Sequence, residues 1–365
     1  MTTEHQRLSV NQQKAIPLEQ WGPYLSERQW GTVREDYSMN GDAWNYFPFS
    51  QSHSRAYRWG EDGLAGICDF FGNLCFGIAL WNGKDKILKE RLFGAGNSEG
   101  NHGEDVKELY YYLDNIPTHY YMEYLYKYPQ QAFPYEDLLE KNRKRSKLEP
   151  EYEILDTGVF DNNEYFDVKV TYAKQNAKDI FIKIDVTNRA AKSAPVTVLP
   201  TLWFYNRWAY AGLDVKPEIK RLNKNAVQAS HYKLGNYYLY FQNADDALFT
   251  ENETNTEKVN QTPNATVFVK DAFHDAIIER KNLRALRDKK SGTKFSPVYK
   301  LKIAAGATKT IYCRFTDQFT NKAFERGFEN VFVTRKNETN DFYASILPAG
   351  MDEDMAKIQR QALAG

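Results

Sequence analysis

Alternating apolar and polar positions dominate much of the chain. In the range 118–129, every second residue from Tyr120 to Tyr128 is aromatic or methionine, and Glu123 and Lys127 lie on the opposite face. A repeat of two residues is that of a half-buried β-strand. Turn residues such as Gly, Asn and Pro separate runs of this kind. Further strands are predicted within residues 63–69, 73–83, 165–174, 179–189, 196–208, 225–233, 236–243, 247–253 and 266–276, and two within 297–316.

Three other segments are typical of helices. In the range 133–146, Pro134 suits a first turn, acidic residues follow it, and the basic residues from Lys141 onward favour the negative end of the helix dipole. After Phe319, apolar residues recur at helical spacing. A last helix begins at Asp352, whose side chain can cap it. The apolar stripe of that helix comprises Met355, Ile358 and Leu363.

The order of these elements predicts the fold class. The strands follow one another without intervening helices, which favours antiparallel over parallel sheets. A chain of 365 residues is long enough for one large domain. We therefore expect a mainly β protein, a large antiparallel two-sheet sandwich with a few helices and a helical C-terminal tail. The predicted parts are a flexible arm at 1–26, the sandwich at 27–318 and a helical segment at 319–365.

The stretch 27–69 has no regular repeat, and its first part is predicted to be ordered loop. It holds three of the 7 tryptophans, among charged residues and glycines. Aromatic faces ringed by charged groups suit sugars, although the same Arg–Trp and Arg–Asp pairs can instead pin a long loop to its scaffold. The sequence leaves both interpretations open. The candidate substrate-binding residues are Trp30, Arg34, Trp44, Arg58, Trp59, Glu61 and Asp62.

Charge and cysteine content narrow the function classes. Lys+Arg 48 and Asp+Glu 48 balance, so the sequence predicts no basic surface for nucleic acid or an anionic membrane. No apolar run approaches the ~20 residues that span a bilayer, and the opening residues are not those of a secretory signal. The odd set Cys68, Cys75 and Cys313 indicates reduced thiols in a cytoplasmic protein. Neither cysteines nor histidines have metal-ligand spacing, so no metal or cofactor is expected.

Several long stretches match a known family. They include SERQWGTVREDYS at 26–38, SRAYRWGEDGLAGICD at 54–69, PTHYYMEYLYKYPQ at 117–130 and VLPTLWFYNRW at 198–208. These stretches resemble the N-terminal region of glycoside hydrolase family 63, the inverting α-glucosidases related to processing glucosidase I. The resemblance is strongest to the long bacterial and fungal cytosolic branch. It covers nearly the whole chain, and its long matches are specific.

The resemblance implies a large N-terminal β-sandwich followed by an (α/α)6 barrel that carries the general acid and the general base. RQALAG at 360–365 is similar to the opening of the first barrel helix. We therefore expect a fragment that lacks the barrel and is inactive on its own. Its expected role is to dock on the barrel and shape the substrate mouth. The expected partners are that barrel and an oligosaccharide or small glycoside, with self-association possible through the uncovered barrel-facing patch.

Catalysis within this chain would require two facing carboxyl groups, about 6.5–9.5 Å apart for an inverting hydrolase. Adjacent residues of an extended chain point to opposite sides, so no catalytic pair is predicted. Two alternatives stay open: a free-standing carbohydrate-binding module, and a sandwich enzyme of the sugar-epimerase type, in which a histidine faces a carboxylate. The candidate carboxylate pairs are Glu35/Asp36, Glu61/Asp62, Glu104/Asp105 and Asp271/Asp275, and the candidate histidine pairs are His102/Glu104 and His274/Asp275.

Overall fold

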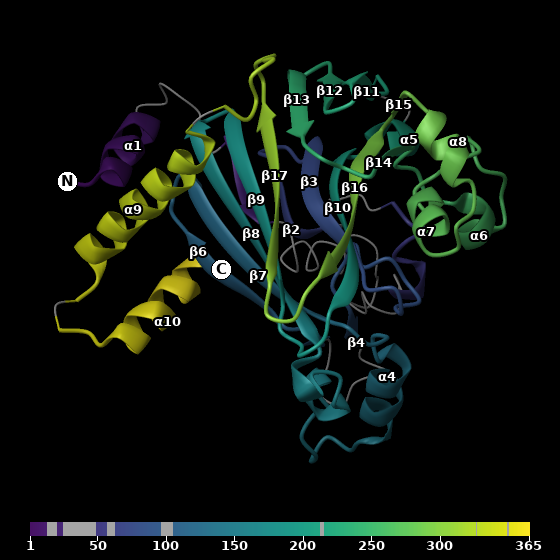
Figure 1. Ribbon diagram of the computed structural model, residues 1–365, viewed down its shortest axis with the longest axis horizontal. Coiled ribbons are helices and arrows are strands. Elements are labelled where there is room, and N and C mark those ends of the chain that lie inside the picture. The colour runs from purple at the N-terminus through teal and green to yellow at the C-terminus, as the bar shows by residue number, and fades with distance from the viewer. Residues whose placement is uncertain are drawn as a thin grey trace.

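The computed structural model describes residues 1–12, 20–24, 49–56, 63–95, 105–211, 215–325, 327–348 and 350–365. Two large antiparallel sheets form the body of the described chain, and helices lie outside them (Figure 1). The predicted fold class, a mainly β two-sheet sandwich with a few helices and a helical tail, is confirmed. Among the helices of these residues, none is long and apolar enough to span a membrane.

The first sheet contains six of the described strands, in the order β1-β2-β3-β10-β16-β14, and all its neighbouring pairs are antiparallel. The β2–β3 hairpin is the one predicted from the sequence. The strand bounds are Trp21–Tyr24 (β1), Leu64–Asp69 (β2), Leu74–Trp81 (β3), Ala194–Phe204 (β10), Asp246–Thr250 (β14) and Lys294–Ile303 (β16).

The second sheet contains nine described strands, in the order β15-β11-β12-β13-β17-β9-β8-β7-β6. Their bounds are Tyr110–Asn115 (β6), Tyr121–Pro129 (β7), Tyr165–Asn176 (β8), Asp179–Asn188 (β9), Glu218–Asn223 (β11), Ala226–His231 (β12), Gly235–Phe241 (β13), Ser291–Gly292 (β15) and Thr308–Thr316 (β17). A separate two-stranded ladder joins Gly94–Ala95 (β4) to Asp105–Val106 (β5).

The main core lies between the two sheets. Strand β7 shows how the sequence pattern builds it, because Met122, Tyr124, Tyr126 and Tyr128 are all 0% exposed and belong to the core cluster. The residues between them, such as Glu123, face the other way and are half-buried. The two-residue repeat therefore correctly predicted this strand, and its aromatic face is the one that packs in the core.

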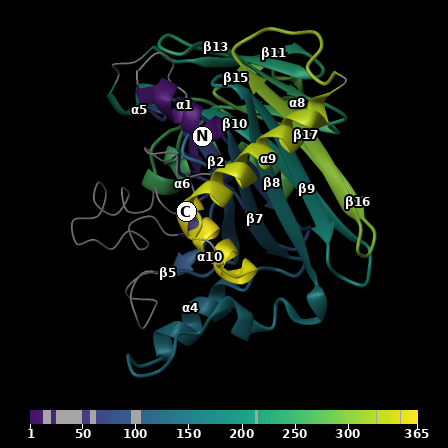
Figure 2. The same cartoon turned by 90° about the vertical axis from the view of Figure 1, so that its left-hand side faces the viewer.

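Helices cover the outer faces of both sheets. Figure 2 shows α9 and α10 lying across the nine-stranded sheet, while α6, α7 and α8 lie on the side of the six-stranded sheet (Figure 1). The helix bounds are Thr3–Gln12 (α1), Tyr135–Lys144 (α4), Arg207–Ala211 (α5), Thr256–Asn260 (α6), Ala272–Ile277 (α7), Leu283–Asp288 (α8), Phe328–Ile346 (α9) and Glu353–Ala364 (α10). Short 3-10 turns occur at Phe49–Gln51, Ile154–Thr157 and Asp161–Asn163.

Two segments differ from the sequence expectation. Within the expected flexible arm, α1 is held by Glu4, which is 0% exposed and accepts hydrogen bonds from the Thr118 N–H and hydroxyl, both at 2.8 Å. The prediction of a strand at 266–276 is wrong. Its second half is helix α7, because Phe273 and Ile277 recur at helical spacing and pack against the sheet. The division of the chain into three parts stays a prediction.

Candidate functional site

The predicted substrate-binding residues Trp30, Arg34, Trp44, Arg58, Trp59, Glu61 and Asp62 lie outside the described residues. The same holds for the candidates Glu35, Asp36, His102 and Glu104, and for the side chain of Asp105. Four of the seven candidates lie in the segment 57–62. The described residues show two sets of contacts that hold the chain, a first anchor just before this segment and a second anchor just after it. These two anchors, and the charged cluster beside the first, form the candidate site.

The first anchor fixes the chain that leads into this segment. The Ala56 N–H donates to the Thr254 hydroxyl at 3.1 Å. The Lys270 ammonium, which is 0% exposed, donates to the Ser52 and Arg55 carbonyl oxygens at 2.7 and 2.5 Å. A buried ammonium needs acceptors, so these carbonyls and Lys270 constrain one another.

Asp271, just before α7, joins this anchor to two neighbouring segments. One carboxylate oxygen, Oδ2, accepts from the Ser54 hydroxyl at 3.0 Å, the Asn255 side-chain amide at 2.8 Å and the Lys258 ammonium at 2.9 Å. Burial raises the pKa of Asp271, but the hydrogen bonds from Lys258 and Asn255 outweigh burial, and the pKa lies below its usual value. Asp271 is therefore an ionised structural hub at neutral pH.

The second anchor fixes the chain that leaves the segment. The Gly63 N–H donates to the Glu90 carbonyl at 2.5 Å. The Glu90 side chain forms a buried ion pair with Lys294 of β16. Gly63 has φ of 86°, and a Cβ there would lie 2.8 Å from the Trp203 ring and 3.1 Å from the Gly77 Cα. Only glycine combines that backbone conformation with so close an approach.

Two histidines that are far apart in sequence meet beside the first anchor. The rings of His53 and His274 stack with centroids 4.1 Å apart at an interplanar angle of 23°. Burial, with the nearby charges of His274 and Lys258, lowers the pKa of His53 to about 4. Burial also lowers the pKa of His274. Both rings are therefore neutral at neutral pH, which permits the stacking.

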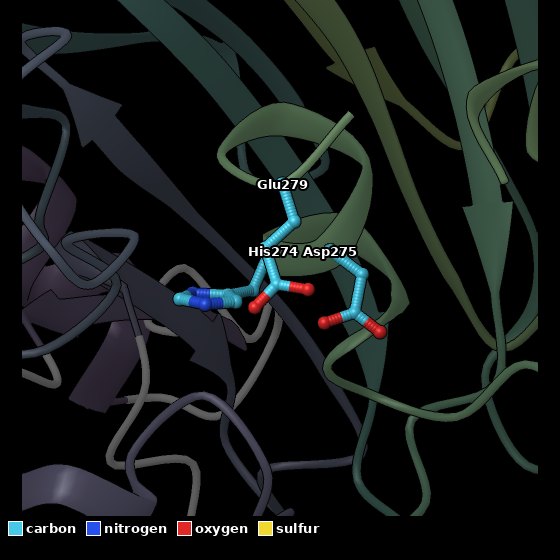
Figure 3. Close-up of side chains that lie close together, drawn as sticks. All are labelled: His274, Asp275 and Glu279. Carbon is cyan, nitrogen blue, oxygen red and sulfur yellow. The ribbon is translucent and has the colours of Figure 1, made fainter. Parts of the chain in front are cut away.

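A possible cation-binding group adjoins the histidine pair. His274, Asp275 and Glu279 project from α7 and the turn after it, with one ligand atom from each within 4.8 Å of the others (Figure 3). The fit to a metal is poor for two reasons. The Leu88 N–H donates to His274 Nδ1 at 3.4 Å, so the proton of the neutral ring sits on Nε2. In this state neither ring nitrogen has a free lone pair for a metal. The Lys258 ammonium also lies 3.8 Å from the Asp275 carboxylate.

The described candidate pairs therefore do not form catalytic sites. Lys258 lies between Asp271 and Asp275 and contacts both, so these carboxylates share a cation instead of facing a water molecule. His274 is 6% exposed and its ring stacks on His53. Burial raises the pKa of Asp275, and Lys258 partly opposes the change. These charged and aromatic side chains therefore hold the neighbouring backbone in position.

A second charged network lies beneath the irregular chain between β3 and β6. Glu108 accepts from the Lys89 ammonium at 2.6 Å, the Tyr126 hydroxyl at 2.6 Å and the Phe93 N–H at 2.9 Å. The Lys89 and Glu108 side chains are both 0% exposed, and the Lys89 ammonium lies 3.8 Å from the centroid of the Phe133 ring. Burial raises the pKa of Glu108, against the attraction of Lys89. This pair holds the backbone that leads to Glu90.

Sequence reasoning named Asp271 as a candidate carboxylate but missed the other residues that build the first anchor. Lys258 and Lys270 carry no pattern of their own, and His53 was one of several scattered histidines. A usable signal did exist, because apolar residues at helical spacing run through the segment that was predicted to be a strand. These buried residues are Val269, Ala272, Phe273, Ala276 and Ile277.

Comparisons with known proteins place the chain within a longer relative. No family model matches it. An uncharacterized protein of Saccharomyces cerevisiae is 40% identical over 410 residues, which cover 100% of this chain and 38% of that protein. The chain thus spans well under half the length of this relative, and most of that protein lies outside the matching region.

Similarities to solved structures are weak. A putative kojibiose phosphorylase from the human microbiome is 7% identical, with a TM-score of 0.25 over 55% of this chain and 21% of that one. A polysaccharide lyase is 9% identical, with a TM-score of 0.31 over 71% and 27%. An α-mannosidase of Bacteroides thetaiotaomicron is 8% identical, with a TM-score of 0.23 over 86% and 32%. All three are named as enzymes of carbohydrates, but at these TM-scores the likeness identifies neither a family nor an activity.

Proposed function

We propose that this chain is a β-sandwich domain of a glycoside hydrolase related to family 63, which shapes the substrate mouth of a helical catalytic domain. The observation that carries the proposal is the yeast relative, which matches the whole chain at 40% identity but has most of its length elsewhere. The remaining part of that relative is long enough to contain a separate catalytic domain. The family-like stretches, at 26–38 and 54–69 among others, supply the type of enzyme.

The two anchors give this domain its role in the proposal. Residues 57–62 include Arg58, Trp59, Glu61 and Asp62, which we propose contact the substrate from the rim of the catalytic site. Buried ion pairs and hydrogen bonds fix the chain on both sides of this segment, at Ala56 and at Gly63. A binding segment that is held at both ends loses less conformational freedom when it engages a ligand.

Helix α10 offers a surface for the helical domain. Met355, Ile358 and Leu363 are 53%, 56% and 55% exposed. Apolar side chains grouped on one helix face are typical of an interface. We propose that the catalytic domain covers this face, and that without it the same face allows self-association.

A cytoplasmic location is part of the proposal. It rests on Cys68, Cys75 and Cys313, all of which are free thiols in the described chain. Cys68 and Cys75 are even register partners on β2 and β3, yet form no disulfide.

The test compares three purified proteins on an aryl α-glucoside: this chain alone, the yeast relative, and a chimera in which this chain replaces the matching region of the relative. We expect turnover by the relative and the chimera and none by this chain. Turnover by this chain alone would contradict a non-catalytic role. A yeast protein without glycosidase activity would contradict the enzyme class.

A second arm separates the binding-module alternative from the proposal. Calorimetry of this chain with gluco- and manno-oligosaccharides should give no binding heat at millimolar sugar, because the proposed rim completes a site whose other walls belong to the catalytic domain. Saturable heat with the chain alone would favour a free-standing carbohydrate-binding module instead.

A further inference from the structure

A groove with a volume of about 460 Å³ lies on the outer side of the six-stranded sheet, and no residue of either anchor is among its described lining residues. Strands β3, β10 and β16 form its floor, and α7, α8 and the turn between them form its wall. This volume falls in the range of small-molecule sites, about 300–1,000 Å³. Neither the proposed rim residues nor the apolar stripe of α10 is among its described lining residues.

The strand register explains the floor of the groove. Thr197 of β10 is the register partner of Trp81 on one side and of Lys300 on the other. Pro195, two residues earlier, is the partner of Lys302. Residues two apart on a strand, and direct partners across strands, share one face of a sheet. The floor is therefore a flat platform with an indole at one side and two lysines at the other.

The wall is apolar with a single cation. Ile277 and Leu283 line it, and Arg280 lies between them in the connection from α7 to α8. Arg280 has φ of 57°, a left-handed conformation that is uncommon for a residue with a side chain. The tight turn thus places an exposed guanidinium on the groove side of the connection.

The charges that line the groove have one sign. Among the described lining residues, three are cationic and none is acidic. Lys300 already has a partner, the Asp246 carboxylate, at 3.3 Å. Arg280 and Lys302 have no hydrogen-bond or ion-pair partner among the described side chains. Among the described side chains, the groove therefore offers two unpaired positive charges, Arg280 on its wall and Lys302 at the lysine side of its floor.

We propose that this groove binds a phosphate monoester of an apolar alcohol. A phosphate monoester is mostly a dianion at neutral pH, which matches the two unpaired cations. The guanidinium of Arg280 suits bidentate contact with phosphate oxygens. The apolar body packs against Trp81, Ile277 and Leu283. A sugar phosphate fits less well, because the lining side chains provide no carboxylate to accept hydroxyl protons.

The test uses phenyl phosphate as the probe and calorimetry at low ionic strength. We expect saturable binding to the full chain at millimolar probe. Inorganic phosphate should bind about tenfold more weakly, because it lacks the apolar body, a difference of about 1.4 kcal/mol. Phenol should show no binding, because it lacks the charge. Glucose 6-phosphate should bind more weakly than phenyl phosphate.

Charge-removing variants locate the site. R280Q and K302Q should each weaken binding of phenyl phosphate up to about fivefold, the range for exposed charge pairs. K309Q is the matched control, because Lys309 is an exposed strand lysine on β17, outside the groove, and it should leave affinity unchanged. Circular dichroism checks that the variants keep the wild-type fold.

Three results would overturn the proposal. The first is no binding of phenyl phosphate at millimolar concentration. The second is equal weakening by K309Q, which would indicate general attraction to the surface. The third is glucose 6-phosphate or inorganic phosphate binding as tightly as phenyl phosphate, which would remove the requirement for an apolar body. Each is independent of whether the chain belongs to a glycosidase.

Discussion

The outer faces of the two sheets are covered in different ways. Helix α9 covers the nine-stranded sheet through an aromatic cluster that includes Phe332 and Phe342, packed against Phe181 of β9. The six-stranded sheet is covered by short helices and irregular chain. There the buried contacts include ion pairs, such as Lys294 with Glu90.

The difference follows from backbone hydrogen bonding. A helix satisfies its own N–H and C=O groups, so an apolar stripe is enough to bury it. Irregular chain leaves these groups open and needs side-chain partners when it is buried. Lys270 and Glu108 serve this purpose, since they bind backbone carbonyls and an N–H, respectively. The irregular cover is also where the predicted binding segment is attached.

The largest effect is expected at the buried Lys89–Glu108 ion pair of the irregular chain between β3 and β6. E108Q leaves the Lys89 ammonium buried without its counter-charge, so the free energy of unfolding should fall by about 3–5 kcal/mol. Chemical denaturation measures this loss. The control is K86M, which removes the exposed pair Lys86–Glu136 and should cost less than about 0.5 kcal/mol. Equal effects of the two variants would show that burial of the pair does not matter.

The next effect concerns the helical cover. F332A removes a side chain that is 7% exposed and packs on the nine-stranded sheet, so the free energy of unfolding should fall by about 3 kcal/mol. V333A, one residue along and 58% exposed, should change it by less than about 0.5 kcal/mol. The denaturant midpoints of both variants measure the two losses of unfolding free energy and hence their ratio. A large loss from V333A would mean that α9 buries a different face.

The histidine pair should make the irregular cover sensitive to acid. The folded pKa of His53, about 4, lies below its unfolded value of 6.5, so the unfolded chain binds more protons between these values. Stability is fully present above pH 6.5 and falls as the pH drops toward 4, by roughly 3 kcal/mol from this group. Burial is the main cause of the lowered pKa, His274 and Lys258 lower it further, and Asp271 and Glu90 oppose the change.

The measurement is the free energy of unfolding as a function of pH for the wild type and H53Q. The variant should lose less stability than the wild type across this window. H5Q is the control, because His5 lies on α1, away from the pair, and its profile should follow the wild type. An H53Q profile parallel to that of the wild type would remove His53 as the cause.

The smallest effect is expected at α10. Arg360 donates to the Asp114 carboxylate at 2.8 and 2.6 Å, so R360M should cost about 1 kcal/mol. I358S, on the exposed stripe, should leave the free energy of unfolding unchanged within about 0.5 kcal/mol. It should, however, reduce self-association measured by sedimentation. A destabilising I358S would mean that the stripe already packs within this chain.

The contrast between the helical cover and the irregular cover also explains which parts of the structure could be predicted from the sequence. Strands β7 to β10 and helix α4 were predictable, because a two-residue repeat or a dipole-matched helix end is local information. The first anchor was not predictable, since Asp271, Asn255 and Ser54 meet only after distant segments are brought together. The groove also depends on register, which places Trp81 and Lys300 on either side of Thr197.

The close approach of Gly63 and Gly77 bears on how this chain can change over evolutionary time. A Cβ at Gly77 would lie 2.9 Å from the Gly63 Cα, so neither position has room for a methyl group. We therefore expect descendants of this chain to keep glycine at both positions, even where side chains packed elsewhere in the six-stranded sheet are exchanged.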